Sequence, residues 1–148
     1  MKVRRAVISD LETLVEFASA EARESENSEK IPATVSEGIR KALEDESIAF
    51  YWVIVDDNNN VIGNISALRE WSDWHAGFYW WIQSMYLVPS QRGKGYIQLM
   101  LNAVKDEMQK QGGLELRLYV HNENATAIKA YTKSGFVNSP YKIMVSTN

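Results

Sequence analysis

The fold is decided by residues 78–111, which read FYWWIQSMYLVPSQRGKGYIQLMLNAVKDEMQKQ. The first part, Phe78 to Val88, predicts a strand that is covered on both faces, because both of its alternating sets are largely apolar. These sets are Trp80, Ile82, Ser84, Tyr86 and Trp81, Gln83, Met85, Leu87. Pro89 ends the strand, and a loop with two glycines follows. From Gly95 to Gln111 apolar residues recur at helical spacing, which predicts an amphipathic helix.

The N-terminal part predicts one strand and two helices. Residues 2–7 alternate as a strand does, and residues 9–12 (SDLE) have the spacing of a capping box that opens a helix. A second capping box, TVSE at residues 34–37, opens the next helix. The acidic segment between them, residues 21–30, is interpreted as a frayed helix end and a loop whose carboxylates are solvated.

The middle of the chain predicts a hairpin. Residues 49–55 are aromatic and β-branched, and they stop at an Asp/Asn-rich turn, residues 56–60. Residues 61–68 return as the partner strand. Residues 69–77 then form a connection that is rich in tryptophan, and we assign no strand to them.

The last part of the chain predicts a strand, a helix and two closing strands. Residues 114–120 form the strand, and Asn124 caps a helix that Gly135 stops. Residues 136–137 and 141–145 then read as strands. The order βααβββαβαβ predicts a single α+β domain over residues 1–148, with helices on both faces of the sheet.

Composition excludes several classes of function. Sixteen basic residues against nineteen acidic residues give a formal charge of -3 over 148 residues, which disfavours binding to nucleic acid. The chain has no cysteine, so thiol chemistry has to come from a cofactor, and we expect no metal site. No stretch approaches the length of a membrane span, and the N-terminus lacks a signal core, so we expect a cytoplasmic protein with no membrane partner.

The glycine loop is a candidate anion site, because it lies where a buried strand turns into the start of a helix. Two other phosphate loops do not fit. A P-loop would need glycine at Val88 and Ser or Thr at Gly95, and a dinucleotide fingerprint would need glycine at Gln98.

Residues 92–97, RGKGYI, resemble the pyrophosphate loop of the N-acetyltransferase family abbreviated GNAT, which has the form Arg/Gln-x-x-Gly-x-Gly/Ala. The loop matches at Arg92 and Gly95 and departs at Ile97, where a small residue is usual. Residues 124–136, NATAIKAYTKSGF, are similar to the family's Asn-x-x-Ala-x-x-x-Tyr-x-x-x-Gly-Phe segment. The segments EWSDW at 70–74 and WWIQS at 80–84 further resemble a bacterial branch of the family.

The resemblance implies a mostly antiparallel mixed sheet that is splayed in its middle, and acetyl-CoA as the acetyl donor. It assigns the donor's pantetheine arm to the backbone of Tyr86, Leu87 and Val88. It assigns the pyrophosphate to the N–H groups of residues 93–97, with Arg92 and Lys94 adding charge at its rim, and it assigns a contact with the cofactor arm to Asn124. The full set of implied cofactor-binding residues is Tyr86, Leu87, Val88, Arg92, Gly93, Lys94, Gly95, Tyr96, Ile97 and Asn124.

The same resemblance implies a reaction. An amine of a small molecule or a protein attacks the thioester directly, and Tyr131 protonates the departing thiolate. A lysine-like acceptor is protonated at neutral pH, so the reaction needs a base that removes a proton from its nitrogen. The candidates are Glu70, Asp73, His75 and a residue of the acidic segment 21–29. Relatives often carry a glutamate at the strand position that Trp81 occupies here.

Three interpretations stay open at the level of the sequence. Of the adjacent Trp80 and Trp81, at least one is core and the other walls the acceptor pocket; Trp71 and Trp74 either line that pocket or do not. A non-catalytic acetyl-CoA sensor is the alternative to an enzyme. The aromatic-rich sheet leaves room for a homodimer.

Overall fold

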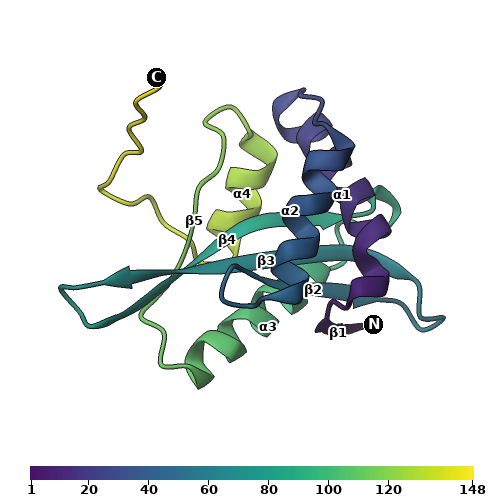
Figure 1. Cartoon of the computed structure of the whole chain (residues 1–148), viewed down its shortest axis with the longest axis horizontal. Helices are drawn as coiled ribbons and strands as arrows, with labels where there is room; N and C mark the ends of the chain where they lie inside the picture. Colours follow the sequence, from purple (N-terminus) through teal and green to yellow (C-terminus); the bar gives the residue numbers. More distant parts are fainter.

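The computed structural model describes all residues from Met1 to Asn148 and is built on one five-stranded sheet (Figure 1). The strand order is β1-β2-β3-β4-β5. The first four strands pair antiparallel, and β5 pairs parallel to β4, so the sheet is mixed and mostly antiparallel as expected. The strands are β1 (Lys2–Arg5), β2 (Phe50–Val55), β3 (Val61–Ser72), β4 (Gly77–Leu87) and β5 (Leu116–Leu118).

Helices cover both faces of the sheet. The four α-helices are α1 (Leu11–Glu26), α2 (Pro32–Glu44), α3 (Tyr96–Lys110) and α4 (Ala125–Lys133), and two short 3₁₀ turns span Ile8–Asp10 and Pro89–Gln91. One core cluster joins α1 and α2 to β2 through Leu14, Ile39 and Val53. A larger cluster joins α3 to β2, β3 and β4. Apolar burial of this kind is the main favourable term in folding.

β4 carries a bulge at Gln83. Ser84 pairs with Ser66 of β3, but the next β3 residue pairs with Ile82, so Gln83 has no partner. The extra residue reverses the alternation: Trp80 and Ile82 face the α3 cluster, and so do Met85 and Leu87 beyond the bulge. The two alternating sets that the sequence predicts for this strand are therefore wrong after Gln83.

The predicted helix over residues 95–111 is confirmed as α3, whereas both predicted capping boxes are wrong. The Ser9 hydroxyl makes no capping bond to α1; before this helix the carboxylate of Asp10 instead accepts hydrogen bonds from the Val7 N–H and from the guanidinium of Arg4, both at 2.8 Å. α2 begins at Pro32, before the second box, since proline's fixed φ suits the first helical position.

The predicted connection over residues 69–77 is also wrong, because β3 and β4 continue through most of it as a long hairpin (Figure 1). Trp71 and Trp74 lie at its end with 58% and 85% of their surface exposed. The predicted closing strands are absent. Residues 136–148 form no strand, because the segment that holds Tyr141 to Val145 leads away from the sheet and finds no neighbour to pair with (Figure 1).

No helix is both long and apolar enough to cross a membrane. Nor does any group of three or more His, Asp or Glu residues lie close enough together to hold a metal ion.

Candidate active site

The glycine loop presents a row of unengaged backbone amides. Gly93 and Gly95 have φ of 76° and 84°, in the left-handed region that favours glycine. No backbone or side-chain acceptor takes up the N–H groups of residues 93–97; the bonds nearby are donated by Gln91, Arg92 and Gln98. Side chains do not crowd the two glycines, since a Cβ at either would meet nothing within 4 Å. The loop and the first turn of α3 therefore form an open site for an anion.

Two cations border this loop, and one of them is already engaged. The Arg92 guanidinium donates from Nε to the Leu87 carbonyl oxygen at 2.8 Å and forms an ion pair with Glu24 of α1, also at 2.8 Å. Lys94 donates only to the side chain of Gln91, at 3.2 Å. Arg92 thus ties the loop to β4 and α1, while Lys94 stays exposed beside the free amides.

Ile97 does not block the loop. Its side chain is half-buried, packs against the α3 core cluster and borders the groove described next. The branched residue at a position where relatives have a small one is therefore accommodated mainly by the core.

A groove runs from the loop along β4, because β4 and β5 diverge. Their pairing ends at Ile82 and Leu118, and from there to Leu87 β4 pairs only with β3. The Gln83 bulge lies at the point of divergence and bends the strand there. Tyr86 and Leu87 line the groove on one side, and α4 lines it on the other. The splayed sheet that the resemblance implies is present.

Two backbone groups on the open edge of β4 bond side chains in place of a neighbouring strand. The Met85 N–H donates to Oε2 of Glu21 at 2.8 Å, and the Leu87 carbonyl accepts from Arg92. Backbone groups that lose a strand partner need such replacements when they are buried.

Glu21 is the residue whose environment differs most from the sequence-based interpretation, which placed it among solvated carboxylates. α1 does not fray there but runs to Glu26, and Glu21 faces β4. Burial, which outweighs the Met85 hydrogen bond, raises the pKa of Glu21 to about 7, with a further contribution from Glu26 and Glu24. The signal was present: Glu21 lies seven residues after Leu14 on the buried stripe.

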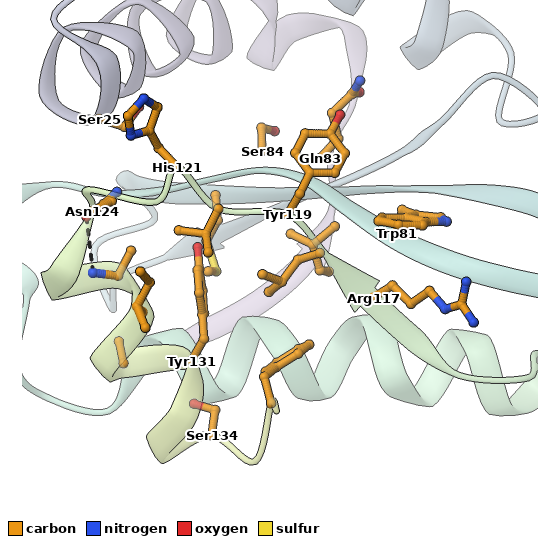
Figure 2. A pocket seen from close by; sticks show the side chains of 18 of the residues that line it. Ser25, Trp81, Gln83, Ser84, Arg117, Tyr119, His121, Asn124, Tyr131 and Ser134 are labelled. Atoms are coloured by element: carbon orange, nitrogen blue, oxygen red, sulfur yellow. Dashed lines mark hydrogen bonds between the residues drawn. The ribbon is translucent and has the colours of Figure 1, made fainter. Parts of the chain in front are cut away.

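Tyr131 extends from α4 into the groove, with its hydroxyl directed toward the sheet (Figure 2). Its ring packs edge-on against Phe136 at 5.9 Å. Burial, and secondarily the charge of Glu21, raises the pKa of Tyr131 to about 12, so the hydroxyl keeps its proton at neutral pH. Tyr131 and Glu21 therefore face one groove and influence each other electrostatically.

Asn124 caps α4 as the sequence predicts. Its Oδ1 accepts from the Ala127 N–H at 3.2 Å (the dashed line in Figure 2), and the residue borders the same groove. Its side-chain amide nitrogen makes no bond within the chain.

The tryptophans divide between core and groove. Trp80 is fully buried and stacks on Phe50 at 5.1 Å, whereas Trp81 lines the groove and packs against Tyr119 at 5.8 Å. Trp71 and Trp74 do not line it. Of the other base candidates, Glu70 is exposed at the groove margin, and Asp73 and His75 are exposed at the hairpin end.

Comparison with known families and solved structures finds proteins that are similar to this chain. The model of the acetyltransferase (GNAT) family matches residues 11–136. A solved structure described as a possible acetyltransferase from Clostridium difficile 630 is 30% identical with a TM-score of 0.92, and the match covers 99% of this chain and 97% of that one. No curated protein sequence matches the chain.

Two more distant structures share the fold. A predicted acetyltransferase from Clostridium acetobutylicum, solved with acetyl-CoA, is 18% identical with a TM-score of 0.81, covering 98% and 95% of the two chains. An aminoglycoside antibiotic 6′-N-acetyltransferase from Acinetobacter haemolyticus is 13% identical with a TM-score of 0.83, covering 100% and 99%.

Proposed function

Because the chain belongs to the acetyltransferase (GNAT) family, we propose that it transfers an acetyl group from acetyl-CoA to a primary amine of a small molecule or a protein. The observation that carries this proposal is the row of free amides at residues 93–97, next to a groove along the unpaired edge of β4. An amide row at a helix start binds phosphate groups through its N–H donors and the helix dipole.

The residues present fit acetyl-CoA. The amides of Gly93, Lys94, Gly95, Tyr96 and Ile97 would hold the pyrophosphate, and the Lys94 ammonium is free to add charge at its rim. Arg92 would act mainly by fixing the loop, since its guanidinium already bonds Leu87 and Glu24.

The groove beyond the loop fits the rest of the donor. The backbone of Tyr86, Leu87 and Val88 would run beside the pantetheine arm, and the free amide nitrogen of Asn124 would meet it from the α4 side. The donor supplies the activated thioester that a chain without cysteine cannot make.

Tyr131 is the proposed proton donor to the leaving thiolate. Its hydroxyl lies in the groove and stays protonated because its pKa is raised to about 12. The raised pKa makes Tyr131 a dependable donor at neutral pH, although a weaker acid than an ordinary tyrosine. Holding the donor and the acceptor in one groove reduces the entropic cost of their encounter.

Two measurements test the proposal. Acetyl-CoA at about 100 times its dissociation constant should stabilise the native protein by about 2.7 kcal/mol and raise its melting temperature by roughly 5 to 10 °C. Release of coenzyme A in the presence of a panel of amines then measures turnover. A protein that acetyl-CoA does not stabilise at millimolar concentration lacks the site that we describe.

Tyr131→Phe separates an enzyme from a sensor. The variant removes only the hydroxyl, so acetyl-CoA should stabilise it as it does the wild type, while kcat falls by about 100-fold or more. Tyr79→Phe, on β4 in the long hairpin and outside the groove, is a matched control. A wild type that binds acetyl-CoA but acetylates no amine would instead be a non-catalytic sensor.

A further inference from the structure

Two hollows of the protein meet at Glu21. One is the groove along β4, and the other is a cavity of about 430 Å³ between α1, α2 and the sheet. Both are bordered by Ala18, Glu21, Gln83 and Ser84. The cavity has an apolar side formed by Leu14, Val35 and Ile39 and a polar side formed by Tyr51, Asn64 and Ser84. It is large enough for a small organic molecule.

The Glu21 carboxylate is partly buried and has no counter-ion. Oε2 accepts from the Met85 N–H, and Oε1 makes no hydrogen bond within the chain. The nearby cation Arg92 pairs with Glu24 instead. Removing an unpaired carboxylate even partly from water costs free energy. Glu21 at the junction of the two hollows therefore lowers the free energy of unfolding when it is ionised.

No cation forms an ion pair with Glu21. Of the basic residues that border the groove, Arg92 pairs with Glu24 and Arg117 with Glu115, and Lys30, Lys105 and Lys142 make no salt bridge with Glu21. Glu24 and Glu26 lie on its own helix, and the phenols of Tyr51 on β2 and Tyr131 on α4 are close enough to sense its charge. α2, β3 and β4 border the cavity through uncharged residues, namely Val35, Gly38, Ile39, Asn64, Gln83 and Ser84. An ammonium group that enters the cavity would therefore find the Glu21 carboxyl group without another ion-pair partner.

We propose that Glu21 is the catalytic base that takes a proton from the ammonium group of the acceptor, which reaches it through the cavity between α1, α2 and the sheet. This inference rests on the proposed acetyl transfer. One N–H bond of the ammonium breaks, and its proton moves to a carboxylate oxygen of Glu21. The freed lone pair of the nitrogen forms a bond to the acetyl carbon while the C–S bond breaks, and the sulfur takes the proton of Tyr131. The nitrogen then loses its second proton, which gives the neutral amide and restores the Tyr131 hydroxyl.

The geometry favours Glu21 over the other carboxylates. Glu70 and Asp73 lie on the projecting hairpin and are exposed, and only Glu70 reaches the groove margin, whereas Glu21 borders both the groove, with Tyr131, and the cavity. The cavity also indicates the class of acceptor: a small primary amine whose apolar part packs against Leu14, Val35 and Ile39 while its ammonium meets Glu21.

Glu21→Gln tests the proposal with the least structural change, because the amide oxygen of glutamine can still accept from the Met85 N–H. We expect kcat/KM for an alkylamine at pH 7 to fall by about 100-fold or more, with stabilisation by acetyl-CoA unchanged. Glu16→Gln makes the same charge change at an exposed position of α1 and should leave kcat/KM as it is.

The pH profile and the choice of amine separate a base from a residue that only supports the fold. The wild-type kcat/KM should rise with pH and level off near pH 7, where Glu21 loses its proton. In Glu21→Gln it should rise without that inflection, toward the pKa of the amine itself, about 10.4 for a lysine-like group. With a fluorinated alkylamine that is already neutral at pH 7, the deficit of the variant should shrink to about tenfold or less.

The outcomes of these assays distinguish a failure of the proposed function from a failure of the assignment of Glu21 as the base. If the wild type releases coenzyme A with none of the amines, the proposed function fails and takes this inference with it. If the wild type turns over and Glu21→Gln matches it, or if the deficit is the same for both amines, only the assignment of the base is overturned.

Discussion

The ionisation of Glu21 should be measurable as a stability difference, whatever the enzyme acts on. Burial raises the pKa of this carboxyl from its ordinary value of 4.5 to about 7 in the folded protein. Each pKa unit corresponds to about 1.4 kcal/mol, so the folded state loses about 3 kcal/mol of stability relative to the unfolded chain when Glu21 ionises. Because the folded state holds the proton more tightly, the contribution of Glu21 to stability is highest below pH 4.5 and falls as the pH rises to 7.

Glu21→Gln removes this ionisation while keeping the shape of the side chain. The assay is urea unfolding of the wild type and the variant at about pH 4 and about pH 8, with the free energy of unfolding taken from the linear extrapolation. At the lower pH the two proteins should be equally stable to within about 1 kcal/mol. At the higher pH the variant should be more stable by about 3 kcal/mol, and this gain should grow between pH 4.5 and 7.

The comparison between the two proteins cancels the other titrations of the chain, such as that of Asp10, whose pKa is lowered by the Arg4 and Val7 hydrogen bonds. Glu16→Gln serves as the control, and its difference from the wild type should not change over this pH range. If the wild type and Glu21→Gln differ by the same amount at both pH values, Glu21 ionises as a solvated carboxyl does, and the description of its environment is wrong.

Two glycine substitutions test the loop and the strand beside it. Gly95→Ala forces a Cβ into a left-handed conformation, so we expect a loss of about 1 kcal/mol in stability and weaker stabilisation by acetyl-CoA, both measured by thermal unfolding. Gly63→Ala would bring a Cβ to 2.5 Å from the Tyr86 carbonyl oxygen, and because that atom is backbone we expect about 2 kcal/mol or more of destabilisation in urea unfolding; an unchanged midpoint would contradict the close packing of β3 on β4.

The features that local sequence determines could be predicted well. The periodicity of α3 depends on residues close together in the chain, and so does the Asn124 cap of α4. The position of the loop between a strand and a helix follows from these elements alone.

The features that depend on a partner from elsewhere in the chain could not be predicted. Residues 9–12 have the spacing of a capping box, but the residue that is engaged there is Asp10, whose carboxylate bonds Arg4 and the Val7 N–H. Residues 141–145 have the composition of a strand, but a strand needs a neighbour with free backbone groups, and none lies beside them here.

The Gln83 bulge explains why the predicted alternation of β4 is wrong, and it also lies at the candidate active site. Reading β4 as a strict alternation hides the bulge, yet the bulge lies where β4 leaves β5. Beyond it the Met85 N–H and the Leu87 carbonyl lack a strand partner, and Glu21 and Arg92 take that place. The extra residue at the bulge thus lies where the groove opens. It also leaves the Met85 N–H free to bond the partly buried carboxylate of Glu21. Glu21 of α1 and Arg92 of the loop thus bond backbone groups of β4 that are distant from them in the sequence. No single stretch of sequence could therefore reveal the arrangement.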